Sequence, residues 1–187
     1  AALETNLEYA SGTGDSQSFD LAYESVSGDV LFTWGVLTGS TACTAGSNCM
    51  RYAGYTGSWS TAAVPTVADS ATNIDLASSP ISDEIVLAAI DNGPNNTNKD
   101  DLSIGYWTGS GWSNNKANFD GSAAVPIEMT KLVAVGWLVN GSASRAVVVY
   151  GDSGATNVGW IECTSGGTFP CTTRVDWPPT PPFESGQ

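Results

Sequence analysis

The sequence contains no histidine and very few basic residues. Its 187 residues include six Lys or Arg against 19 Asp or Glu, which gives a formal net charge of −13. A surface of this sign repels nucleic-acid phosphates and anionic lipid headgroups, so we expect no nucleic-acid partner. The chain also lacks a nucleophile elbow and a phosphate-binding loop. The sequence therefore predicts a non-enzymatic protein, with a carboxylate pair of the glycosidase type as the one catalytic arrangement left open.

Long apolar runs and helical patterns are missing as well. No run approaches the roughly 18 apolar residues that cross a bilayer, so no membrane insertion is expected. No long segment shows the apolar period of a helix, whereas Gly, Ser, Thr and β-branched residues dominate throughout. The predicted fold class is all-β with little or no helix, and the length suits one domain.

The four cysteines fall into two close pairs, each enclosing a loop rich in Gly, Ser and Thr. Local bridges 43–49 and 163–171 are our preferred pairing among the connectivities that four cysteines allow. A zinc site is disfavoured because histidine and a Cys-x-x-Cys spacing are absent. Disulfides persist in oxidising compartments, so we expect an extracellular or cell-surface protein, exported with a signal peptide cleaved ahead of "AALETNLEY". The cysteines are Cys43, Cys49, Cys163 and Cys171.

A pattern about 50 residues long is written three times along the chain. Each copy begins with a segment that alternates apolar with polar residues, which is typical of a strand with one covered face. A turn signal follows, and then a segment that is apolar on both faces, which is typical of a strand covered on both sides. The first segments are "FDLA" (19–22), "IDLA" (74–77) and "IEMT" (127–130), and the second are "DVLFTW" (29–34), "EIVLAAI" (84–90) and "RAVVVY" (145–150).

A third segment in each copy ends at a Gly-bearing tetrad that precedes a tryptophan. These third segments are "MRYAGY" (50–55), "LSIGYW" (102–107) and "NVGWIE" (157–162). The tetrads open the stretches "YTGSWS" at 55–60 and "WTGSGWS" at 107–113. In the third copy the corresponding stretch is eroded to "TSGGTF". The third copy also carries "KLVAVGW" (131–137), which we interpret as an insertion. Each copy is thus predicted to form three or four antiparallel strands, the fourth beginning at the tetrad tryptophan.

These registers resemble the blades of secreted bacterial β-propeller-type repeat proteins found among surface, lectin-like and appendage-associated proteins. The resemblance implies propeller-blade-like sheets, but a closed propeller needs at least about four blades and this sequence shows three. We therefore expect an open arrangement, or one completed by a neighbouring subunit. The predicted organisation is a single domain over 1–177 with repeats at about 17–71, 72–124 and 125–177, an outer or donor strand at 1–16, and a proline-rich tail at 178–187.

The tetrad tryptophans allow two interpretations. Trp59, Trp107 and Trp112 are candidate platforms for stacking on a sugar ring. Alternatively, the tetrad glycine supplies a turn with positive φ while the tryptophan covers the neighbouring repeat. A feature that recurs at one register favours packing. Carboxylates recur too, at Asp20, Asp75 and Glu128, where they either gather around a cation or substrate or accept backbone hydrogen bonds from a nearby turn.

The polar loop "DNGPNNTNKDD" (91–101) offers oxygen ligands for calcium at Asp91, Asn95, Asp100 and Asp101, and no cofactor other than calcium is expected. A solvated loop is the alternative, because the spacing matches no EF-hand. Asn95 and Asn140 each begin an Asn-x-Ser/Thr sequon in a predicted turn.

Low lysine content, local disulfides and an unclosed repeat count favour a structural role. We predict a subunit of an extracellular filament, pilus-like appendage or cell-surface coat that self-associates through sheet edges or through the N-terminal strand. A glycan-binding lectin or adhesin module is the first alternative. A fragment of a propeller-type glycoside hydrolase is the second.

Overall fold

The structure is a computed structural model that describes residues 17–36, 49–61, 63, 71–91, 101–120, 133–152, 157–164 and 175–176. In these residues the chain forms eleven β-strands and no helix, which confirms the predicted all-β class. The strands make three antiparallel sheets, and in each sheet every strand pairs with the next one along the chain.

The first sheet contains β1 (Phe19–Tyr23), β2 (Val30–Gly35) and β3 (Met50–Tyr55). The second contains β4 (Ala71–Ser78), β5 (Ile85–Asp91), β6 (Asp101–Trp107) and β7 (Trp112–Asp120). The third contains β8 (Val133–Asn140), β9 (Ala143–Asp152), β10 (Asn157–Thr164) and β11 (Val175–Asp176). Because β7 begins at Trp112, the prediction that a fourth strand starts at the tetrad tryptophan is confirmed for the second sheet.

The first strand of the third sheet is not where the repeat pattern placed it. Strand β8 pairs with β9 through the turn at Asn140 and Gly141, and it covers most of 131–137, which the sequence analysis treated as an insertion. The segment at 127–130, expected to be that strand, lies outside the described residues. Chemical likeness to "FDLA" was therefore the wrong criterion here, and direct connection to the turn is the right one.

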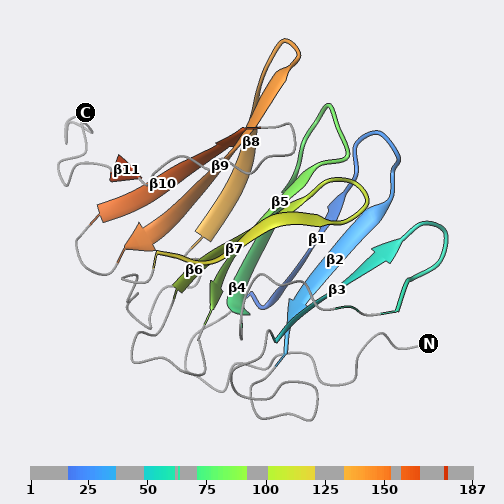
Figure 1. Ribbon diagram of the computed structural model, residues 1–187, viewed down its shortest axis with the longest axis horizontal. Coiled ribbons are helices and arrows are strands. Elements are labelled where there is room, and N and C mark those ends of the chain that lie inside the picture. The colour runs from blue at the N-terminus through green and yellow to red at the C-terminus, as the bar shows by residue number, and fades with distance from the viewer. Residues whose placement is uncertain are drawn as a thin grey trace, which may run out of the picture.

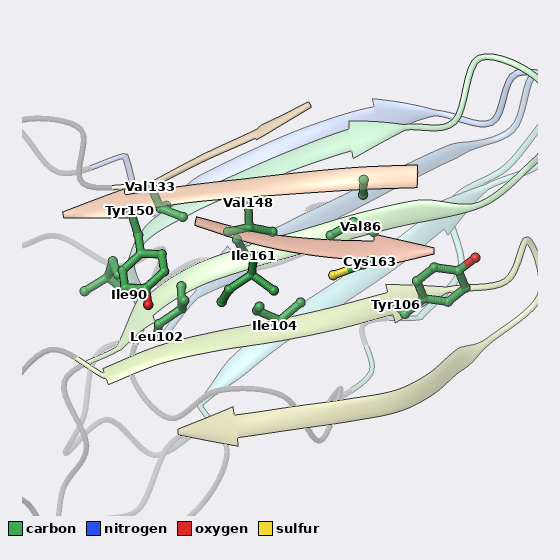
Figure 2. Packing of buried hydrophobic residues seen from close by; sticks show 12 residues of the cluster. Val86, Ile90, Leu102, Ile104, Tyr106, Val133, Val148, Tyr150, Ile161 and Cys163 are labelled. Carbon is green, nitrogen blue, oxygen red and sulfur yellow. The ribbon is translucent and has the colours of Figure 1, made fainter. Parts of the chain in front are cut away.

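The three sheets lie side by side with the second sheet in the middle (Figure 1). Strand β4 of the middle sheet contacts both β1 and β8, so the first strands of the sheets adjoin one another. One apolar cluster fills the space between the first and second sheets, and another fills the space between the second and third. Figure 2 shows the latter cluster, in which Ile104 of β6 and Ile161 of β10 meet from opposite sheets.

Strand β5 shows why the second segment of the middle repeat is apolar on both faces. All six residues from Ile85 to Ile90 are fully buried. Side chains alternate across a strand, so Ile85, Leu87 and Ala89 pack toward the first sheet and the intervening residues toward the third. The expectation of a strand covered on both sides is thus met in the middle sheet. Strands β2 and β9 have the same apolar composition, but only one face of each adjoins the middle sheet.

Both tetrads form a tight turn with a glycine in the left-handed region, three residues long in the first sheet and four in the second. Gly57 and Gly109 have φ angles of 95° and 88°, a region that residues with a Cβ rarely adopt. The flanking residues pair across the turn, Tyr55 with Trp59 in the first sheet and Trp107 with Trp112 in the second. The turn function that the sequence assigned to these glycines is confirmed by their φ angles.

The two turns provide a matched pair of substitutions. A Cβ at Gly109 would lie 2.9 Å from Asp83 Cβ, whereas a Cβ at Gly57 meets nothing within 4 Å. Gly57→Ala is expected to lower the free energy of unfolding by about 1 kcal/mol, the cost of the left-handed backbone alone. Gly109→Ala should cost more, by about 1 kcal/mol further, because Asp83 must move. Chemical denaturation of both variants measures the difference, and equal losses would contradict the clash.

Candidate functional site

The repeated carboxylates link each sheet to the next. Asp20 Oδ2 in β1 accepts a hydrogen bond of 2.7 Å from the Leu76 amide in β4. Asp75 Oδ2 in β4 accepts one of 2.6 Å from the Val135 amide in β8. The interpretation as backbone acceptors therefore holds for these two residues, although the donor is the first strand of the neighbouring sheet and not a nearby turn. Glu128 lies outside the described residues.

This series of links stops at both ends of the stack. In the second sheet the carboxylate directly precedes the donor amide, as Asp75 precedes Leu76. The same position ahead of Val135 in the third sheet is Ala134, which is exposed and has no carboxylate. In the first sheet the corresponding amide, that of Leu21, donates to Oδ1 of its own neighbour Asp20 at 2.8 Å. The end sheets thus differ from the middle sheet at the position that forms the link.

Trp107 and Trp112 pack between the first two sheets. Their rings form a three-membered cluster with Tyr52 of β3, with ring centroids 5.6 to 5.7 Å apart. Trp107 Nε1 also donates a hydrogen bond of 2.6 Å to Glu24 Oε1, and the Glu24 side chain is buried. Both tryptophans therefore cover a neighbouring sheet. Their predicted role in glycan binding stays a prediction.

Trp59 occupies in the first sheet the position that Trp112 has in the second sheet, but its environment is different. It is 45% exposed, and its ring contacts Tyr55 at 5.2 Å and Phe32 at 6.2 Å between centroids. No sheet lies on this side of the first sheet in the described part of the chain (Figure 1). Trp59 therefore belongs to the exposed part of an aromatic face, whose other part is a buried cluster of Trp34, Val36, Cys49 and Ala53.

We call this surface the first-sheet outer face. Strand register places nine residues in three rows on it, of which Trp34 and Ala53 are fully buried, so the face is exposed only in part. At the rim of the face, Phe19 and Leu21 are 52% and 48% exposed, whereas the equivalent Ile74 and Leu76 of the middle sheet are 1% and 9% exposed. Residues that are core in one repeat are thus surface in another. The rows are Phe19, Trp34 and Arg51; Leu21, Phe32 and Ala53; and Tyr23, Val30 and Tyr55.

The third sheet has an outer face at the opposite end of the stack. Leu138 is 59% exposed, and Val149 and Val158 are also exposed. Arg145 forms an ion pair with Glu162 on this face. We call it the third-sheet outer face, and its rows are Ala134, Val149 and Trp160; Gly136, Val147 and Glu162; and Leu138, Arg145 and Thr164.

Both outer faces carry very little negative charge for a chain with 19 acidic residues. The rows of the first-sheet outer face contain Arg51 and no acid, and those of the third-sheet outer face contain one acid, Glu162, paired with Arg145. The remaining members are apolar, aromatic or small, apart from Thr164. In the exposed part of each face, which includes Phe19, Leu21 and Leu138, apolar composition, exposure and low charge together are the properties of an interaction surface.

Cys49 and Cys163 are the described cysteines, and both are buried and disulfide-bonded. Their partners are not among the described residues, so bridges 43–49 and 163–171 stay predictions. Peptide mapping without reduction is expected to find one internal bridge in each of the two loops. Reduction should lower the free energy of unfolding by on the order of 2 kcal/mol for each bridge. A peptide that joins Cys49 to Cys163 would contradict this pairing.

The calcium and glycosylation predictions fall mostly outside the described residues. Asp91 and Asp101 are paired across β5 and β6, whereas Asn95 and Asp100 lie outside the described part. The calcium site therefore stays a prediction. Asn140 is exposed at the β8–β9 turn, so its sequon is accessible. Asn95 lies outside the described residues.

Within the described ranges the structure contains no group of three or more His, Cys, Asp or Glu residues that could hold a metal ion. No helix in this part of the chain is long and apolar enough to cross a membrane. Neither a protein-family model nor a curated protein matches the sequence.

Proposed function

We propose that the protein is a non-enzymatic structural subunit of an extracellular assembly, such as a filament, a pilus-like appendage or a surface coat. The observation that carries the proposal is the exposure of Phe19 and Leu21 at positions where the next repeat has fully packed core residues. Such a surface costs free energy in water and is stabilised when another sheet covers it. The disulfides at Cys49 and Cys163 and the absence of histidine agree with a durable, non-catalytic chain.

The three sheets are proposed to be propeller-type blades. Successive strands pair in order within each sheet, and the first strands of neighbouring sheets adjoin one another, as blades do around an axis. Three such sheets are fewer than the about four needed for closure. Further sheets must therefore come from outside the described residues if the stack closes.

The described residues favour sheet faces over sheet edges as the contact. On the outer edge of the first sheet, the Tyr52 amide and carbonyl both hydrogen-bond to Ala63 at 2.9 Å, so part of this edge is already paired. Most of the exposed large apolar side chains lie instead on the outer faces; Val26, Ile81 and Val139 are the exceptions. The N-terminal strand exchange that the sequence suggested lies outside the described residues and stays a prediction.

Electron microscopy of negatively stained native material, together with the particle mass in solution, tests the proposed function. We expect ordered polymers or oligomers, and a particle mass that rises with concentration. A monomer at every soluble concentration, with no polymer on the native cell surface, would contradict a structural role.

A glycan-binding module is the second candidate, and one observation favours it. Trp59 and Tyr55 form an exposed aromatic pair, which is the type of surface that stacks on a sugar ring. On a glycan array, Trp59→Ala should abolish retention if this surface binds sugar. Phe19→Ala serves as the control on the same face, because Phe19 lies outside the Tyr55–Trp59 pair. No retention of the wild-type protein would remove this candidate.

A further inference from the structure

We propose that a second copy of this chain covers the exposed part of the first-sheet outer face, around Phe19, Leu21 and Tyr55, with its third-sheet outer face. The contact is head-to-tail, so it continues the order in which the three sheets already stack within one chain. This inference rests on the proposed function and adds to it the partner, the two surfaces and their register.

In each link between sheets, the carboxylate position is Asp20 or Asp75 and the donor amide is that of Leu76 or Val135. We call these, and the corresponding Ala134 and Leu21 of the end sheets, the link positions. The link positions of the two end sheets fit each other. Inside the chain, the carboxylate position of one sheet faces the donor amide of the next, as Asp20 faces Leu76. Continuing this register places Ala134 of one copy against Leu21 of the next. Ala134 presents no carboxylate, and the Leu21 amide already donates to its own Asp20. Neither surface therefore buries an unpaired polar group at this position, which is the requirement for a stable contact.

A second position shows the same complementarity. Glu24, four residues after Asp20, accepts the hydrogen bond of Trp107 from the next sheet. The residue four after Ala134 is Leu138, and the tetrad position of Trp107 in the first sheet is Tyr55. The contact between copies thus places Leu138 against the Tyr55–Trp59 pair. A buried hydrogen-bonded pair is replaced by a contact of a leucine with two aromatic rings, and the side chains on both sides are exposed in the single chain.

Charge directs the association to these faces. A net charge of −13 makes two copies repel each other over most of their surfaces. The two outer faces are low in acid, and the one acid in the rows of the third-sheet outer face, Glu162, is neutralised by Arg145. An approach of two first-sheet outer faces would bring the Arg51 residues together, whereas the head-to-tail approach does not.

The head-to-tail contact leaves one free face at each end of a pair of copies. Such a contact builds a ring if the rotation closes and a filament if it does not. Two copies would contribute six sheets, which lies within the about four to eight blades of closed propellers. A two-copy ring and an open filament are both products of the same interface.

The test uses one charged substitution on each face. Leu21→Glu disrupts the first-sheet outer face, and Leu138→Glu disrupts the third-sheet outer face. Both side chains are exposed, so each variant should keep the wild-type circular dichroism and melting temperature. Ile81→Glu is the matched control, because Ile81 is an exposed apolar residue at the β4–β5 turn of the middle sheet.

Sedimentation velocity gives the readout. Each outer-face variant alone should be monomeric, with association at least about tenfold weaker than that of the wild type, because a charge is buried without a partner. A mixture of the two variants should form a discrete dimer of twice the subunit mass, since each variant keeps one intact face. Ile81→Glu should assemble like the wild type.

Several results would overturn the head-to-tail contact. Unchanged assembly of Leu138→Glu, or a variant mixture that stays monomeric, would reject it while leaving the structural role in place. A wild-type protein that never assembles would reject both proposals. A native polypeptide in which a further part of the same chain covers Leu21 would reject the second copy as the occupant.

Discussion

Replacement of Ile104 by alanine is expected to lower the free energy of unfolding by about 2 to 5 kcal/mol. Ile104 is fully buried in β6 and packs in the cluster between the second and third sheets (Figure 2). Truncation removes apolar contacts and leaves a cavity that the facing sheet cannot fill without moving. The effect should also reach β9 and β10, because their side chains form the other wall of the cluster.

Ile81→Ala is the matched control for this substitution. The same atoms are removed, but Ile81 is 44% exposed, so the expected loss is below about 1 kcal/mol. Urea denaturation monitored by tryptophan fluorescence measures both variants. If Ile104→Ala unfolds at the wild-type urea concentration, the two sheets do not share a packed core.

Asp75→Ala is expected to lower the free energy of unfolding by about 1 to 3 kcal/mol. The substitution leaves the Val135 amide without its carboxylate acceptor between the second and third sheets. A buried donor without a partner loses its hydration without a replacement. The loss therefore reports on the link between sheets and not on packing volume, because aspartate contributes little apolar surface.

Asp75→Asn separates the acceptor from the charge. Asparagine keeps one oxygen that can accept from Val135, so this variant should lose less stability than Asp75→Ala. Hydrogen exchange at the Val135 amide is the local measurement, and it should be faster in the alanine variant. Equal stability of wild type and Asp75→Ala would show that the link contributes nothing to sheet stacking.

The strands and turns were largely predictable because they depend on local patterns. "MRYAGY" is β3 to the residue, and the runs after the first two turns became β2 and β5. Alternating or unbroken apolar segments bounded by glycine turns specify strands without reference to tertiary contacts. The third repeat was the exception, because "IEMT" matched the first segments in chemistry while β8 is the strand connected to the turn.

The environment of equivalent residues was not predictable from the sequence. Trp59 and Trp112 close corresponding turns, yet Trp59 is 45% exposed and Trp112 packs on Tyr52. The sequence also could not separate a sheet edge from a sheet face as the contact, because that depends on which side of β1 adjoins β4. Asp20 and Asp75 were found by their repetition, but their donors come from another sheet.

Cysteine cross-linking between copies tests the account most directly. The link positions bring backbones close within the chain, because one carboxylate spans from strand to strand. Both described native cysteines are disulfide-bonded, so added thiols report on the new contact. When copies carrying Leu21→Cys are mixed with copies carrying Ala134→Cys and oxidised, a disulfide-linked dimer joining these two positions is the predicted product. If the mixture yields no such dimer while the wild-type protein assembles, the end sheets do not stack in the order proposed.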